Sequence, residues 1–449
     1  MNSQLKKNIK FLRLLNSSFA FSCLLFLNNQ ANARAYQLKD LIEKSHTHPE
    51  VKLEYYEVEK ASSLFERIDG ETRPKLQILG GIGPNKSVVG NATQFEESSR
   101  VDTITYLAKF DLKVPFYAFN REGDLKKAAT GNKKVKELDV AKKEQELVKK
   151  IKEYYFGFQY ASSLNEFAKD TLKDLDDVLT DMKSGKNKKV AQDEITKLSV
   201  FRSLAQIKKY EIEKGLAQSL LGLKYVAQDD ELTIEQDYIE FNLRDIPQLP
   251  TLKQNLPETN IDLQKASIGL EAKSSFLSSE KKAQLPIFGL FSSFDWTSTN
   301  KSSHQNSPFA YDPFNKSDFS IGVGLVWDID FGVKSSNVKV AQIELEAIKT
   351  QQAFALKNLP IKVEKTYLDF IEAKNKAIEL EKTYKSSKKL FNSTATGVAL
   401  GLTPVKDIIE SYTLKAQIYQ QYVESVYNFE MKLAELSLEV GAELDPLLK

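Results

Sequence analysis

Residues 103–116 read TITYLAKFDLKVPF, and residues 318–331 read DFSIGVGLVWDIDF. Apolar side chains take every second position of both stretches, and the positions between them are mostly polar. A period of two over a dozen residues is typical of a β-strand with one apolar and one polar face. We therefore predict strands over about 102–116 and 318–331.

The two strands belong to a longer repeat with an offset of about 212 residues. The clearest correspondence pairs Ile151, Tyr155, Phe158 and Ala161 with Val363, Tyr367, Phe370 and Ala373. Each half reads as a helix, a weaker strand after a proline, a strong strand and a very long helical hairpin. This order predicts an internally duplicated chain.

The repeat sets the predicted domain boundaries. The first repeat, 36–225, holds a helix, strands over about 74–83 and 102–116, and a helical hairpin over about 121–225. Residues 226–255 form a linker between the repeats. The second repeat, 256–441, holds a helix, strands over about 286–297 and 318–331, and a hairpin over about 334–440. Residues 442–449 form a C-terminal tail.

The hairpins are predicted to be coiled coils. A helix of about 60 residues extends roughly 90 Å, more than a compact domain needs. A heptad seam on the last helix consists of Ile409, Tyr412, Ala416, Tyr419, Val423 and Val426. At the preceding turn, we expect Thr403 to be the N-cap and Pro404 the first helical residue.

The first 35 residues are typical of an export signal peptide. Lysines and an arginine precede an apolar run from Phe19 to Leu27, and small residues then allow cleavage after Ala33 or Ala35. Cys23, the only cysteine, lies in this segment. Removing the segment takes away five basic residues and no acidic ones, which leaves a slight acidic excess and nothing that favours nucleic acid as a partner.

The alternating strands can be interpreted in two ways. One is a sheet with one face on a soluble core. The other is an α+β membrane protein whose apolar strand faces contact lipid, with Tyr106, Phe110, Phe116, Phe319, Trp327 and Phe331 on that face. After residue 35 no run of 18 apolar residues could cross a bilayer as a helix. Because four strands cannot close a barrel, several copies would have to pool their antiparallel strands in one transmembrane β-barrel.

Enzymes and exported structural proteins are the competing classes. The chain has three histidines, His46, His48 and His304, and no phosphate-binding glycine loop, so we predict neither catalysis, nor a metal site, nor a cofactor. An exported coiled coil or adhesin without a pore would account for the long helices. It does not account for the strands.

The sequence resembles the TolC family of outer-membrane efflux proteins over nearly the whole mature chain. The matching segments are Arg73-Pro74 and Leu285-Pro286 before strands, WDIDFG at 327–332 and GLTPVKDIIE at 401–410. The resemblance implies a homotrimer in the outer membrane of a Gram-negative bacterium, with a periplasmic helical tunnel (an α-barrel) that docks on an adaptor protein and an inner-membrane transporter. Such a duct passively conducts small molecules or proteins in efflux or type I secretion.

The resemblance also implies site residues. Asp407 and Glu410 match an acidic pair that narrows the tunnel mouth, and their spacing places both on one side of a helix. A solvated helix face is the alternative interpretation. The residues expected to contact the adaptor at the two hairpin tips are Gly401, Leu402, Thr403, Gly185 and Lys186. The position of the basic residue that helps latch the mouth in some family members falls near Thr403, which is not basic.

Overall fold

The structure is a computed structural model that describes residues 36–71, 73–91, 94–183, 192–234, 238–300, 309, 312, 315–399, 402–446 and 448. These residues form two compact units. Unit 1 comprises the described residues of Met1–Pro49, Glu144–Pro247 and Glu364–Lys449, and unit 2 those of Glu50–Lys143 and Gln248–Val363. The predicted signal peptide and its cysteine lie outside the described residues.

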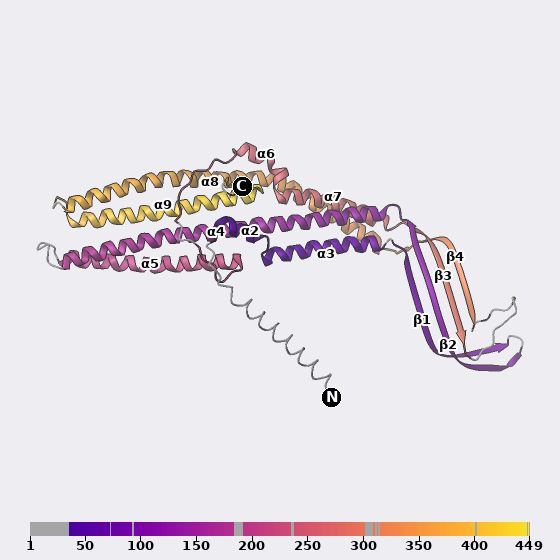
Figure 1. The fold of residues 1–449 in the computed structure, drawn as a ribbon. Coiled ribbons are helices and arrows are strands. Elements are labelled where there is room, and N and C mark those ends of the chain that lie inside the picture. Colours follow the sequence, from indigo (N-terminus) through magenta and orange to yellow (C-terminus); the bar gives the residue numbers. More distant parts are fainter. Residues whose placement is uncertain are drawn as a thin grey trace, which may run out of the picture. The chain divides into compact units, whose positions relative to one another are not determined.

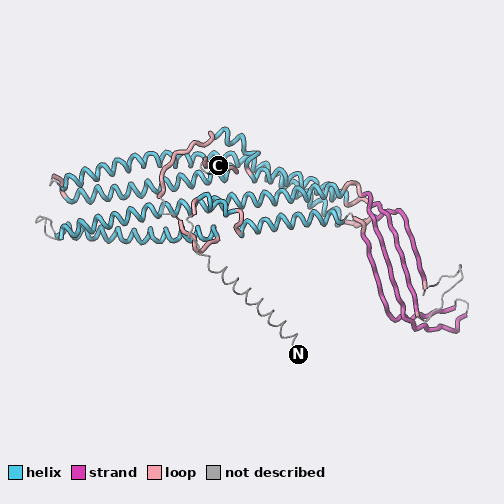
Figure 2. The backbone as a smooth tube through the Cα atoms, in the orientation of Figure 1, coloured by secondary structure: helices cyan, strands magenta, loops and turns pink. Residues whose placement is uncertain are grey.

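Unit 2 contains a four-stranded antiparallel sheet with the order β1-β2-β3-β4 (Figures 1 and 2). The strands are β1 (Lys75–Asn91), β2 (Gln94–Tyr117), β3 (Ile287–Thr299) and β4 (Lys316–Val326). Ile78, Phe110, Phe294 and Phe319 pair in one row across the four strands. The next row pairs Leu79, Lys109, Asp295 and Asp318, on the opposite face. The sheet therefore has the apolar and polar faces that the period of two predicts.

The end predicted for the last strand is wrong. Strand β4 ends at Val326, so Trp327 and Phe331 lie in the connection that follows it. The Trp327 indole donates a hydrogen bond to the Gln284 carbonyl at 3.0 Å. The Asp330 carboxylate accepts from the backbone N–H groups of Gly332 and Lys334 at 3.2 and 2.9 Å. These bonds satisfy donors that the start of the next helix would leave unpaired, so they favour helix initiation over further strand.

The helix predicted before the first strand pair is divided into α2 (Leu38–Ser45) and α3 (Pro49–Glu71). Before the second strand pair, α7 (Ile261–Lys282) is the predicted helix, and α6 (Leu249–Thr259) lies mostly in the stretch predicted as linker, 226–255. Pro49 begins α3, where its missing N–H costs nothing. Asn260 separates α6 from α7, and its side chain accepts from the Leu263 backbone N–H. The matching breaks are in keeping with duplication, which stays a prediction.

The two predicted helical hairpins are present. The first consists of α4 (Arg121–Lys183) and α5 (Gln192–Ala227), and the second of α8 (Val333–Ala399) and α9 (Val405–Val440). Within unit 1, α9 contributes to the core through Val423, Val426, Phe429, Leu433 and Leu436, all at most 1% exposed. The heptad seam predicted on α9 is thus buried at Tyr412, Val423 and Val426.

The predicted start of α9 is one residue early. The helix begins at Val405 with Pro404 as its N-cap, in extended backbone at φ −65° and ψ 149°, and no side chain caps it. The carbonyl of Pro404 accepts from the Asp407 backbone N–H at 3.1 Å. Thr403 therefore precedes the cap.

Among the described helices, none combines the length and the apolar character that crossing a membrane requires.

Candidate functional site

The last turns of α4 and α8 and the first turns of α5 and α9 lie at the same end of unit 1 (Figure 1). Leu175 and Leu179 of α4 and Leu198 of α5 form a buried apolar cluster there, and Ile409 of α9 packs against it. The second hairpin is therefore held to the first by apolar contact directly beside the turns. We call this end of unit 1 the tip.

The predicted acidic pair lies on the first turns of α9 at the tip. Asp407 is half-buried, and Glu410 is exposed and pairs with Lys406 at 3.3 Å. Ile408, Ile409 and Tyr412 line a small cavity against α4 and α5, so the acidic pair lies off the face that packs on the first hairpin. Asp407 is also favoured by the positive end of the α9 dipole.

The other predicted tip residues are only partly described. Leu402 is 79% exposed. Thr403 approaches Gly397 of α8, where an added Cβ would lie 2.5 Å from the threonine hydroxyl oxygen. Gly401, Gly185 and Lys186 lie outside the described residues.

A row of aromatic side chains holds α9 between α4 and α8; the predicted heptad seam includes Tyr412 and Tyr419 of this row, but no sequence pattern predicted their partners on α4 and α8. The Tyr412 hydroxyl donates to Thr171 of α4, and Tyr419 stacks on Phe167 with ring centroids 4.5 Å apart. Tyr384 of α8 also stacks on Tyr422, at 5.8 Å. Burial raises the pKa of Tyr412 and of Tyr419 to about 12, so both phenols stay neutral hydrogen-bonding groups.

Lys415 lies among these rings. Its ammonium group is 4.7 Å from the Phe391 centroid, 5.4 Å from that of Tyr412 and 5.6 Å from that of Phe167. The three rings come from three helices, α8, α9 and α4, so one cation contacts all of them. Burial lowers the pKa of this lysine, and Asp170 and Asp174 oppose that shift.

An apolar groove of about 600 Å³ runs beside this row. It is lined by α4, α5 and α9, with Ala161, Leu164, Ala168, Leu204, Ala205 and Ile212 among its apolar residues. Lys208 and Glu211 add charge at α5.

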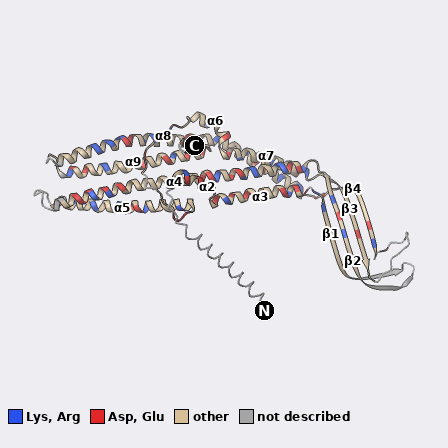
Figure 3. Ribbon diagram, in the orientation of Figure 1, with Lys and Arg blue, Asp and Glu red and all other residues tan. Residues whose placement is uncertain are grey.

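The residues predicted to face lipid on the strands are exposed. Tyr106 and Phe110 are each 38% exposed, Phe116 61% and Phe319 69%. On the opposite face, Lys109 lies 3.6 Å from Asp111 and 3.7 Å from Asp295. Figure 3 shows acidic and basic residues on the strands and mixed along the helices.

The histidines show no metal site in the described part of the chain. His46 contacts Glu144 at 2.9 Å, and buried His48 lies edge-on to Tyr225. No group of three or more His, Cys, Asp or Glu side chains within the described ranges could hold a metal ion.

Comparison with known proteins identifies the fold. No protein-family model and no curated protein matches the chain. The outer-membrane channel OprN superposes with a TM-score of 0.74 at 13% identity, over 91% of each chain. The outer-membrane protein VceC of Vibrio cholerae gives 0.74 at 13%, over 91% of this chain and 97% of that one. The CmeC outer-membrane channel of Campylobacter jejuni gives 0.71 at 13%, over 91% and 86%. The likeness confirms the predicted fold class of long helical hairpins and four antiparallel strands.

Proposed function

Because the chain has the fold of the TolC-type outer-membrane channels, we propose that it is a passive exit duct in the outer membrane of a Gram-negative bacterium. In this proposal it conducts small molecules or proteins from the periplasm to the exterior, without chemistry. The observation that carries the proposal is the sheet. It has one face rich in exposed aromatic and aliphatic side chains, one polar face, and two edge strands, β1 and β4, with no partner strand among the described residues.

The unpaired edges support a homotrimer. An open sheet edge in hydrocarbon leaves backbone N–H and C=O groups without partners, at several kcal/mol each. If β4 of one copy pairs with β1 of the next, every edge disappears on closure. Three copies would contribute about twelve strands, enough for a barrel with a water-filled interior. Phe110 and Phe319 would then face lipid, and Lys109, Asp111 and Asp295 would face the lumen.

The tip supplies the proposed constriction and docking site. Asp407 and Glu410, repeated around a threefold axis, would form a ring of carboxylates at the periplasmic mouth, which would hold cations and repel anions. Leu402 and Thr403, together with the tip of the first hairpin, would contact a periplasmic adaptor that links the duct to an inner-membrane transporter. We further propose that the repeats are 36–225 and 256–441, joined by the linker and followed by the tail.

Purified protein tests this function. Extracts of outer membranes in mild detergent should yield trimers that dissociate on heating, and these trimers should conduct ions in planar lipid bilayers. The matched control is the same extract from cells that lack the gene. A monomer that inserts no conducting pores would exclude the duct and favour an exported structural protein.

A further inference from the structure

The C-terminal tail folds back along α9. Gly441, at φ 78°, adopts the left-handed conformation that favours glycine, and its N–H bonds to the Ser437 carbonyl at 3.0 Å. The next N–H, of Ala442, bonds to the same carbonyl at 3.1 Å. Leu444 and Asp445 then return into unit 1, where they are 4% and 3% exposed. We call residues 441–446 the strap.

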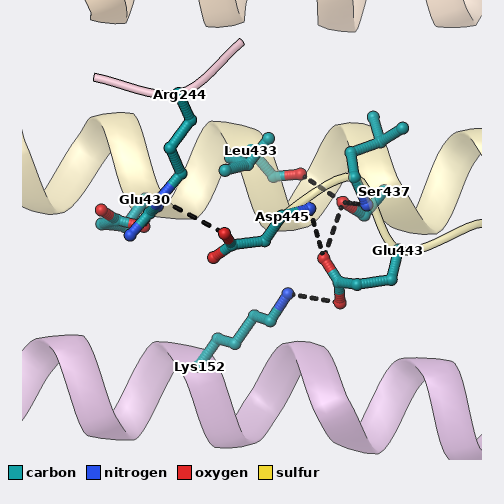
Figure 4. Close-up of polar contacts among 8 residues, drawn as sticks. Lys152, Arg244, Glu430, Leu433, Ser437, Glu443 and Asp445 are labelled. Carbon is teal, nitrogen blue, oxygen red and sulfur yellow. Dashed lines mark hydrogen bonds and ion pairs between the residues drawn. The ribbon is translucent and has the colours of Figure 1, made fainter. Parts of the chain in front are cut away.

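Ser437 fixes the returning strap to α9. Its hydroxyl donates to the Leu433 carbonyl at 2.9 Å and accepts from the Leu444 backbone N–H at 3.2 Å. The Glu443 carboxylate in turn accepts from the Asp445 backbone N–H at 2.9 Å. These bonds set the positions from which the two acidic side chains of the strap project (Figure 4).

Each acidic side chain of the strap meets a buried cation on a different segment. Glu443 accepts from the Lys152 ammonium of α4 at 2.7 Å, and the lysine side chain is only 4% exposed. Asp445 lies 3.3 Å from the Arg244 guanidinium, whose side chain is 8% exposed. Arg244 comes from the linker between the repeats and also pairs with Glu430 of α9. Figure 4 shows the strap between the helix that carries Lys152 and the linker residue Arg244.

The linker also contacts unit 1 away from Arg244. The Ile239 N–H donates to the Ser163 hydroxyl at 3.0 Å, and Phe241 packs edge-on against Phe429 at 5.2 Å. Residues 234 and 238–248 have no helix or strand, and most are exposed. Arg244 holds this segment against unit 1, because a buried guanidinium that lost its carboxylate partners would be uncompensated, and an uncompensated buried charge costs far more than an exposed one.

We propose that residues 441–446 act as a strap that holds the inter-repeat linker against α4 and α9. Glu443 pairs with Lys152 of α4, and Asp445 pairs with Arg244 of the linker. Undoing the strap frees the linker without unfolding the hairpins. The strap thus keeps the linker ordered. This inference is independent of the proposed exit duct.

Hydrogen exchange of the full chain, purified in detergent, tests the strap. In Asp445→Asn, backbone exchange of residues 238–247 should accelerate about tenfold or more, because a charge-assisted contact to a buried guanidinium is lost. Peptides of α5 from 196–212 should exchange as in the wild type. Glu443→Gln, at a less buried carboxylate, should have the same effect to a smaller degree. It serves as the second variant in case Asp445→Asn does not fold.

Glu435→Gln is the matched control, because Glu435 is a half-exposed carboxylate on α9 that pairs with Lys432 at 2.9 Å. It should leave exchange of residues 238–247 unchanged. The proposal is overturned if Glu443→Gln leaves linker exchange at the wild-type rate. It is also overturned if exchange rises equally in the linker and in α5, since that pattern reports general destabilisation.

Discussion

Asp407 and Glu410 are the residues on which the proposed constriction depends. We expect Asp407→Asn combined with Glu410→Gln to weaken block of single channels by divalent cations about tenfold, since each 1.4 kcal/mol of lost attraction changes affinity tenfold. The substitutions keep the side-chain size and remove the charge. The measurement is the cation concentration that halves conductance in planar bilayers.

The control for this prediction is Glu381→Gln, which removes a carboxylate from a solvated i, i+4 pair with Lys385 on α8. It should leave the block unchanged. Equal block in the wild type and in the double variant would place the constriction elsewhere and assign Asp407 and Glu410 to a solvated helix face.

Glu430 predicts a pH dependence of stability. Burial raises its pKa from the ordinary value of 4.5, although Arg244 opposes the shift. The folded state therefore holds the proton of the Glu430 carboxyl group more tightly than the unfolded chain does. The stability that protonated Glu430 contributes is fully present below the unfolded pKa and is lost as the pH rises through the folded pKa. Glu430→Gln cannot ionise. It should flatten the fall in the thermal midpoint as the pH rises above the ordinary glutamate value of 4.5, followed by circular dichroism. A variant whose midpoint falls as steeply as that of the wild type would contradict this assignment.

At the scale of elements, two glycines of α5 make a matched pair. A Cβ at Gly222 would lie 2.4 Å from the Tyr154 ring of α4, whereas one at Gly215 would meet nothing within 4 Å. Gly222→Ala should destabilise the protein by about 1–3 kcal/mol, because overpacking pushes the helices apart. Gly215→Ala should stabilise it by about 0.5–1 kcal/mol through helix propensity. The thermal midpoints of the two variants should shift in opposite directions, and equal shifts would refute the close α4–α5 contact.

Much of the element order was predictable because its signals are local. Alternation around Phe110 and heptad spacing around Val423 predict a strand and a helix from neighbouring residues alone. The end of β4 was not predictable in this way. Alternation continues in the sequence through Trp327 to Phe331, but Asp330 bonds to backbone groups of the next helix and ends the extended conformation. The break before Pro49 likewise interrupts a helix within a continuous polar pattern, and α6 forms within the stretch predicted as linker.

At the scale of the whole molecule, the candidate site was predictable only where it is local. The spacing of Asp407 and Glu410 placed both on one side of a helix. The rings around Lys415 come from segments more than 200 residues apart, Phe167 and Phe391, and no local pattern connects them. The same is true of Arg244 and Asp445. Tertiary packing decides these contacts, so they became visible only in the structure.

The proposed trimer makes a prediction about the sheet edges. Ile78 on β1 and Phe319 on β4 lie in one row of the sheet, separated by β2 and β3. Three strand spacings of about 4.8 Å place them about 14 Å apart, beyond the roughly 7 Å that a disulfide spans. In a closed barrel these edges would meet between copies. The double variant Ile78→Cys and Phe319→Cys, in a Cys23→Ser background, should therefore form covalent dimers and trimers on oxidation, detected on non-reducing gels.

Leu76 and Ile321 lie two residues from Ile78 and Phe319 on the same face. Leu76→Cys should be combined with Phe319→Cys, and Ile78→Cys with Ile321→Cys, so that neighbouring registers between copies are also tested. Phe110→Cys with Phe294→Cys is the matched control, because the two residues are direct partners on β2 and β3 of one chain. It should close a disulfide within the chain and keep the mass of a monomer. If the control oxidises while every edge combination stays monomeric, β1 and β4 do not meet between copies, and the pooled barrel is wrong even if the protein conducts.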